Sequence, residues 1–263
     1  MPVKLIAENL TVADPVLLEA IQARNPGPLR EIAGIAAAVG AEALDINLGP
    51  ARKGLAEAME FVLDALTDHW GGRLWLDGTD PKVMELAASR WRGGTVLNGY
   101  ALDASREAVL DLAVEYKLDL VVFLMGRHGI PKSAAERLAL AAELAGRAEE
   151  RGLPLQNLVF DPVLAPLGWT DGQEINSALR EILPGLRDLF GGEARSVLGL
   201  GNLVTRSTGG EKPRGIEELF LTYAAGLGLT HAMVNVKNAD LLKAYRAVRI
   251  FEGLSPFAPG EFQ

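Results

Sequence analysis

The chain has 263 residues and a formal net charge of −8, with 49% hydrophobic and 23% charged residues. This composition is typical of a globular protein, and the acidic balance argues against a nucleic-acid partner. The chain contains no cysteine, which excludes disulfides, thiolate metal sites and a cysteine nucleophile. The N-terminal segment does not resemble a signal peptide, and no stretch is apolar for long enough to span a bilayer. We therefore expect a cytoplasmic protein with no membrane partner and no bound metal.

Short apolar runs alternate with amphipathic stretches along the chain, which is the pattern of repeated strand–helix units. The expected strands are Lys4–Glu8, Ala43–Leu48, Arg73–Asp77, Thr95–Asn98, Leu118–Met125, Leu158–Asp161, Ser196–Gly201 and His231–Val236. The expected helices are Pro28–Val39, Leu55–His69, Pro81–Trp91, Ser105–Tyr116, Ser133–Arg151, Glu174–Phe190, Gly215–Gly226 and Ala239–Phe251. Two of these helices have clear start signals: Asp80 precedes a proline, and Ser133 is followed three residues later by Glu136.

The expected strands are apolar without strict alternation, as in a parallel sheet that is covered by helices on its faces. Eight such units within this length predict a (β/α)₈ TIM barrel that forms a single domain over residues 1–263. An open, doubly wound parallel sheet is the alternative fold, since both are built from the same repeating unit.

Polar residues recur at the carboxyl ends of the expected strands, where TIM-barrel enzymes place their active sites. These residues are Glu8, Asn9, Asp45, Asn47, Asp77, Asn98, Asp161, Asn202 and Asn235. Gly199 and Gly201 beside Asn202 would let a flat ligand approach the backbone closely. The competing interpretation is that these residues cap helices or form turns.

The residue types at these strand ends restrict the chemistry. They include no Ser–His pair, which excludes a nucleophilic triad. A carboxylate can accept two adjacent hydrogen bonds, and an amide offers one donor group and one acceptor. Such a set suits the 2-amino and N3–H edge of a pterin or a guanine, provided that the strand ends converge on one pocket.

Six sequence motifs, in order, resemble the methyltetrahydrofolate:corrinoid/iron–sulfur protein methyltransferases. This family belongs to the pterin-binding superfamily that includes dihydropteroate synthase. The motifs are Ala43-Leu-Asp-Ile-Asn-Leu-Gly-Pro50, Leu76-Asp-Gly-Thr79, Leu97-Asn98, Gly129-Ile-Pro-Lys132 with Arg137-Leu-Ala, Asp161-Pro162, and Val197-Leu-Gly-Leu-Gly-Asn202. The resemblance implies a TIM barrel, a homodimer, and transfer of a methyl group from N5 of methyltetrahydrofolate to the Co(I) corrinoid of a partner protein.

The resemblance also implies roles for individual residues. Asp77, Asn98 and Asp161 would contact the pterin ring, with Asp45 and Asn47 in support. Asn202 would lie near N5 and stabilise the transition state within a hydrogen-bond network, with Asp77 and Asp161 completing the catalytic set and Gly199 and Gly201 lining the site. Independently of the resemblance, Arg206, Lys212 and Arg214 flank the loop after Asn202, where they would meet the glutamate tail of a folate; a flexible basic loop is the competing interpretation.

The chain departs from the family pattern at Gly78, Asp80 and Gly201, and two of these changes remove a serine hydroxyl beside the expected pocket. Two alternative functions therefore stay open. One is another transferase of the pterin-binding superfamily, such as a dihydropteroate synthase-like enzyme. The other is a non-catalytic subunit that binds a pterin or docks a corrinoid protein.

Overall fold

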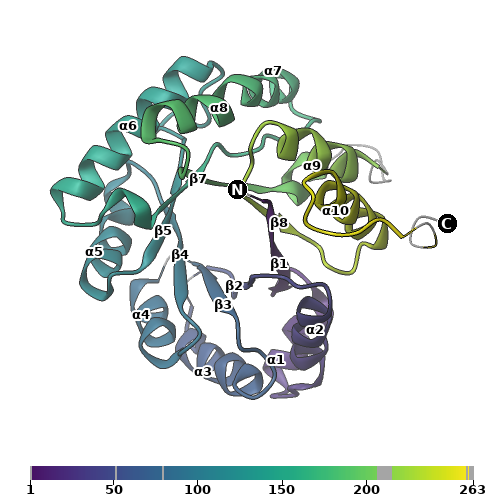
Figure 1. Ribbon diagram of the computed structural model, residues 1–263. Helices are drawn as coiled ribbons and strands as arrows, with labels where there is room; N and C mark the ends of the chain where they lie inside the picture. Colours follow the sequence, from purple (N-terminus) through teal and green to yellow (C-terminus); the bar gives the residue numbers. More distant parts are fainter. Residues whose placement is uncertain (1, 51, 79, 206–214, 259, 261–263) are drawn as a thin grey trace.

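The computed structural model describes residues 2–50, 52–78, 80–205, 215–258 and 260. Eight parallel strands follow one another in chain order and close into a barrel that is surrounded by helices (Figure 1). The strands are β1 (Lys4–Thr11), β2 (Ala43–Asn47), β3 (Arg73–Asp77), β4 (Thr95–Tyr100), β5 (Asp119–Phe123), β6 (Leu158–Asp161), β7 (Arg195–Gly199) and β8 (His231–Val234). The closed order confirms the TIM barrel and excludes the open sheet.

The helices form the outer ring of the barrel. They are α1 (Pro15–Gln22), α2 (Gly27–Ala38), α3 (Leu55–Leu66), α4 (Pro81–Arg90), α5 (Glu107–Tyr116), α6 (Ala134–Glu150), α7 (Gly172–Ser177), α8 (Leu179–Phe190), α9 (Ile216–Gly226) and α10 (Ala239–Phe251). Both predicted start signals are confirmed: Asp80 accepts a hydrogen bond from the N–H of Lys82, and Ser133 accepts one from the N–H of Glu136. Within the described ranges, no helix is long and apolar enough to cross a membrane.

Two helical predictions need correction. Helix α1 was not predicted, although Asp14 caps it by accepting from the N–H of Val16. The expected helix Glu174–Phe190 is divided into α7 and α8 at Ala178. Both differences lie in segments that follow strands, so they change the walls of the barrel mouth more than the barrel itself.

Several strand ends also differ from the prediction. Strand β1 continues to Thr11, and its register against β2 shifts between Ala7 and Leu10. Strand β7 ends at Gly199 and is followed by a 3₁₀ turn, η3 (Leu200–Val204). Asn202 therefore lies on a tight turn above the strand and not at the strand end itself. Strands β5 and β8 are shorter than expected and end at Phe123 and Val234.

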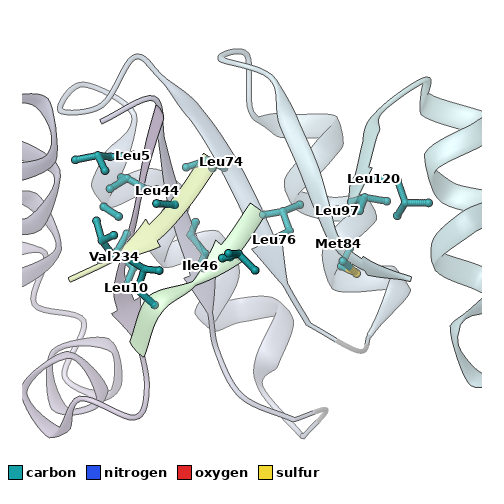
Figure 2. Close-up of a cluster of buried hydrophobic side chains, with 14 of the residues drawn as sticks. Leu5, Leu10, Leu44, Ile46, Leu74, Leu76, Met84, Leu97, Leu120 and Val234 are labelled. Carbon is teal, nitrogen blue, oxygen red and sulfur yellow. The ribbon is translucent and has the colours of Figure 1, made fainter. Parts of the chain in front are cut away.

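Successive side chains of each strand point alternately toward the helices and into the barrel, which gives two apolar layers. Leu44, Ile46, Leu74, Leu76 and Leu97 point outward and are buried beneath the helices, as Figure 2 shows for this part of the core. The inward-facing layer is smaller and closes the interior of the barrel; it comprises Ile6, Ala43, Trp75, Val96, Val121, Val159, Val197 and Met233. Burying one large aliphatic side chain contributes about 1.5–3 kcal/mol, so this double layer holds the strand ends rigidly in place.

Candidate active site

A cavity of about 580 Å³ opens at the carboxyl end of the barrel. Every predicted site residue within the described ranges lines it: Asp45, Asn47, Asp77, Asn98, Asp161, Gly199, Gly201 and Asn202. The period of two along a strand explains this convergence. Asp77 lies two residues beyond Trp75, Asn98 beyond Val96 and Asp161 beyond Val159, so each polar side chain follows an inward-facing core residue. Arg206, Lys212 and Arg214 fall outside the described residues.

The cavity has further lining residues. Glu8, Asn9 and Asn235 were recognised as polar residues near strand ends but were not predicted to belong to the site. Phe123, Met233, Thr205, Thr11 and Asp14 were missed altogether. Phe123 could have been found by the same alternation, since it lies two residues beyond the inward-facing Val121. Thr11 and Asp14 could not have been found in this way, because β1 extends beyond the end that the sequence pattern indicates.

Hydrogen bonds connect the polar groups on β2, β3 and β4. Nδ2 of Asn47 donates to Oδ2 of Asp77 at 2.6 Å, and Oδ1 of the same amide accepts from the N–H of Gly49 at 2.9 Å. Between β4 and β2, the next strand but one, Nδ2 of Asn98 donates to Oδ1 of Asp45 at 3.4 Å. Asp45 and Asn98 are both buried. The carboxyl groups of Asp45 and Asp77 are therefore held in fixed orientations before any ligand binds.

The environment makes these carboxyl groups harder to ionise. Burial raises the pKa of Asp45 well above its usual range, and the negative charges of Asp77 and Glu8 raise it further, against the hydrogen bond from Asn98. Burial also raises the pKa of Asp77, although the amide of Asn47 and the positive charge of Arg106 oppose this. Acidic groups that are crowded and desolvated in this way are stabilised when a ligand brings N–H donors to them.

Asp161, at the end of β6, has similar properties. The side chain is buried, and burial raises its pKa to about 7, although the N–H of Val163 donates to Oδ1 at 2.7 Å and works in the opposite direction. One oxygen of the carboxylate thus has a backbone donor, and the second oxygen accepts no hydrogen bond from the residues that the structure describes. A ligand with two adjacent N–H donors would match this carboxylate.

Glycines make room around Asn202 at the mouth of the cavity. A Cβ atom on Gly199 would lie 3.4 Å from Nδ2 of Asn202, so the amide folds back over the end of β7. The side chain of Asn202 is exposed, which leaves it able to turn toward a ligand. Together with the buried carboxyl groups below, it provides a neutral donor and acceptor at the open side of the cavity.

Arg106 supports the site from outside the cavity. Its Nη1 donates to the carbonyl oxygens of Gly78 at 3.2 Å and Gly99 at 3.1 Å, and so ties the segments after β3 and β4 together. Gly99 allows Asn98 to sit where it does, because a Cβ at this position would lie 2.9 Å from the carbonyl oxygen of Val121. Neither residue was predicted to belong to the site.

A model of the pterin-binding enzymes matches residues 18–235, which is more than half of the chain. The chain belongs to this family. The resemblance found in the sequence motifs is thereby confirmed at the level of the superfamily. Among the described residues, no cluster of three His, Asp or Glu side chains has the arrangement of a metal site.

Individual relatives agree with this assignment. The chain is 21% identical over 244 residues to a methylcorrinoid:tetrahydrofolate methyltransferase of Eubacterium limosum, covering 91% of this chain and 88% of that protein. Dihydropteroate synthase of Xanthomonas albilineans in complex with 7,8-dihydropteroate has a similar structure, with a TM-score of 0.69, 21% identity and coverage of 97% and 94% of the two chains. Dihydropteroate synthase of Yersinia pestis gives a TM-score of 0.68 at 17% identity, with coverage of 97% and 94%. At these identities the structural matches show a shared fold.

Proposed function

We propose that this protein is a methyltransferase that moves a methyl group between N5 of a tetrahydropterin, such as methyltetrahydrofolate, and the cobalt of a corrinoid held by a partner protein. The proposal is supported by membership of the pterin-binding enzymes and by the similarity to a methylcorrinoid:tetrahydrofolate methyltransferase. The observation that carries it is the set of buried acceptors, Asp45, Asp161 and Asn98, around one cavity.

The pterin would be bound through its 2-amino and N3–H edge. Asp161 would accept two hydrogen bonds from this edge, because a carboxylate presents two oxygens in one plane. Asn98 and Asp77 would contact the remaining ring positions, with Asp45 and Asn47 holding them in place through the hydrogen bonds described above. Gly199 and Gly201 would leave space for the flat ring.

Asn202 would act at N5. This nitrogen is a poor leaving group from a methyl carbon until it gains positive character, so a proton must reach it as the carbon–nitrogen bond breaks. An amide is too weak an acid to supply that proton. Asn202 would therefore stabilise the developing charge by a hydrogen bond, as part of a network with Asp77 and Asp161, while water provides the proton.

The same residues serve both directions of transfer. The sequence resemblance implies transfer from methyltetrahydrofolate to Co(I), whereas the name of the Eubacterium limosum protein gives the methylcorrinoid first. Both directions pass through one transition state, in which N5 is partly bonded to the methyl carbon. A group that eases departure of N5 in one direction also eases its attack in the other.

Five further features belong to the proposal. Arg206 would meet the glutamate tail of the folate, and the chain would form a single domain over residues 1–263. The protein would act as a cytoplasmic homodimer, as the resemblance and the sequence composition imply. It would have no nucleic-acid partner, because a net charge of −8 repels phosphate backbones.

Anaerobic absorbance spectroscopy tests the proposal. Cob(I)alamin and methyltetrahydrofolate are mixed with and without the protein, and the decay of the Co(I) absorption band is recorded. We expect protein-dependent loss of this band. If free cobalamin does not react, the partner corrinoid protein replaces it in the same assay. Tight pterin binding with no transfer to either acceptor would favour the non-catalytic alternative, and absence of pterin binding would contradict the proposal as a whole.

A further inference from the structure

Arg137, on α6, is a fully buried arginine without a carboxylate partner among the described residues. Its side chain has no exposed surface, and its Nε lacks a hydrogen-bond partner in the part of the chain that the structure describes. Burial lowers its pKa to about 10, so the guanidinium remains charged at neutral pH. A buried charge of this kind is costly to keep, which calls for an explanation of what it does.

The two terminal nitrogens of Arg137 hold two points of the segment after β6. Nη1 donates to the carbonyl oxygen of Pro162 at 3.1 Å, and Nη2 donates to the carbonyl oxygen of Ile175 on α7. Pro162 follows Asp161 directly. The guanidinium therefore holds the peptide group between Pro162 and Val163 in place and connects it to α7.

The next residue, Val163, has a left-handed backbone conformation with φ of 63°. This region is unfavourable for a β-branched residue, because the Cβ atom crowds the following carbonyl oxygen. The conformation directs the N–H of Val163 onto Oδ1 of Asp161 at 2.7 Å. The strain is thus located at the residue that orients the carboxylate, between two contacts that hold it there.

The rest of the segment is fixed as well. The side chain of Asn176 exchanges two hydrogen bonds with the backbone of Ala165, at 3.0 and 2.8 Å. The N–H of Leu167 donates to the carbonyl oxygen of Leu203, on the turn that also carries Asn202. The segment therefore forms a continuous connection from Arg137, past Asp161, to the turn at the mouth of the cavity.

We propose that Arg137 is a positioning residue for Asp161, which it orients through Pro162 and the strained Val163. The inference rests on the proposed function for the role of Asp161 as the pterin acceptor. The fork of the guanidinium is essential because it bonds two carbonyl groups at a fixed separation. A lysine keeps the charge but presents one ammonium group, which cannot bond both carbonyls in the same geometry.

The test compares Arg137→Lys with Arg147→Lys. Arg147 lies on the same helix, but its guanidinium is exposed and pairs with Glu107 at 2.8 Å. In the protein without ligand, the ionisation midpoint of the Asp161 carboxyl is followed by ¹³C NMR and assigned with Asp161→Asn. In parallel, methyltetrahydrofolate binding is measured by calorimetry at pH 8.

In Arg137→Lys we expect a higher ionisation midpoint of Asp161, because the N–H of Val163 no longer stabilises the carboxylate as well. We also expect roughly tenfold weaker pterin binding. Arg147→Lys should match the wild type in both measurements. If Arg137→Lys does not fold, Arg137→Met takes its place. Because loss of the charge alone would also raise the midpoint, the readout is then the amide signal of Val163, which should respond less to ionisation of Asp161 than in the wild type; an unchanged response would overturn the positioning role.

An unchanged midpoint of Asp161 in the folded variant would overturn the positioning role, whatever the ligand does. Failure of the wild type to bind the pterin would refute the proposed function instead, while the NMR titration would still decide the role of Arg137. The two proposals can therefore fail separately.

Discussion

A Cβ atom on Gly201 would lie 2.9 Å from Oε1 of Glu8, so the turn that carries Asn202 packs directly against a carboxylate from β1. We predict that Gly201→Ala displaces the carboxylate of Glu8 within the cavity. The free energy of unfolding should change by less than about 1 kcal/mol, since the end of a flexible side chain can move away at little cost. A crystal structure and thermal denaturation of the variant check both points; an unmoved Glu8 or a loss of several kcal/mol would contradict the prediction.

Asn202→Ala should separate rate from affinity. We expect the methyl-transfer rate to fall by roughly 10²-fold, because one hydrogen bond to the developing charge is lost. The affinity for methyltetrahydrofolate should change little, since Asn202 is exposed at the mouth and the buried carboxyl groups bind the ring. Stopped-flow absorbance and calorimetry measure the two quantities. A large loss of affinity with an unchanged rate would move Asn202 to a binding role.

Asp161→Asn should make the ligand-free protein more stable at high pH. The folded pKa of Asp161 is raised to about 7 from 3.8, so the wild type loses stability as the pH rises through this interval. Asparagine carries no charge and still accepts from the N–H of Val163. We expect the variant to be more stable by about 2–4 kcal/mol above pH 7, with no difference below pH 4. Urea unfolding above pH 7 and below pH 4 measures the stability of the variant and the wild type. Equal stability of the two proteins at pH 8 would refute the prediction.

Glu42, near the amino ends of the strands, has the opposite dependence on pH. Burial alone would raise its pKa, but hydrogen bonds and charges from His231 and Lys4 lower it to about 2. Its contribution to stability is therefore present above pH 4.5 and is lost as the pH falls toward 2. We expect Glu42→Gln to destabilise the protein by about 1–2 kcal/mol at pH 7, after allowance for solvent screening.

The matched control for Glu42→Gln is Glu31→Gln, because Glu31 is exposed and lies 3.6 Å from Lys237. Glu31→Gln should leave the free energy of unfolding almost unchanged. Denaturant unfolding between pH 3 and pH 7 compares the two variants. A difference between Glu42→Gln and the wild type that does not shrink as the pH falls would show that packing, and not charge, accounts for the effect.

Much of the barrel could be predicted from the sequence, because each strand is an apolar run and amphipathic stretches separate the strands, two of them with clear helix start signals. The polar residues of the site could be predicted for the same reason: Asp77, Asn98 and Asp161 come at the ends of such runs. The register shift in β1 could not be predicted. It depends on pairing with β2, and it places Thr11 and Asp14 beside the cavity.

Contacts that are distant in sequence were also beyond prediction. Arg137 is on α6, and its role depends on carbonyl groups 25 and 38 residues away. Arg106 likewise donates to the carbonyl oxygen of Gly78, which is 28 residues away. Helix α1, in contrast, was missed despite a visible signal, since Asp14 before Pro15 repeats the pattern of Asp80 before Pro81.

The central claim is that the barrel mouth is a pterin site with Asp161 as its acceptor. The most direct test is to titrate methyltetrahydrofolate at pH 8 into the wild type, Asp161→Asn and Asp171→Asn. Asp171 lies in the same connection after β6, but it is outside the cavity and pairs with Lys132 at 2.9 Å. We predict that Asp161→Asn weakens binding by about 1–3 kcal/mol, because the substitution replaces one acceptor oxygen with an NH₂ donor that cannot accept from the second N–H of the pterin. Asp171→Asn should bind as the wild type does. Equal affinity of all three proteins would contradict the account.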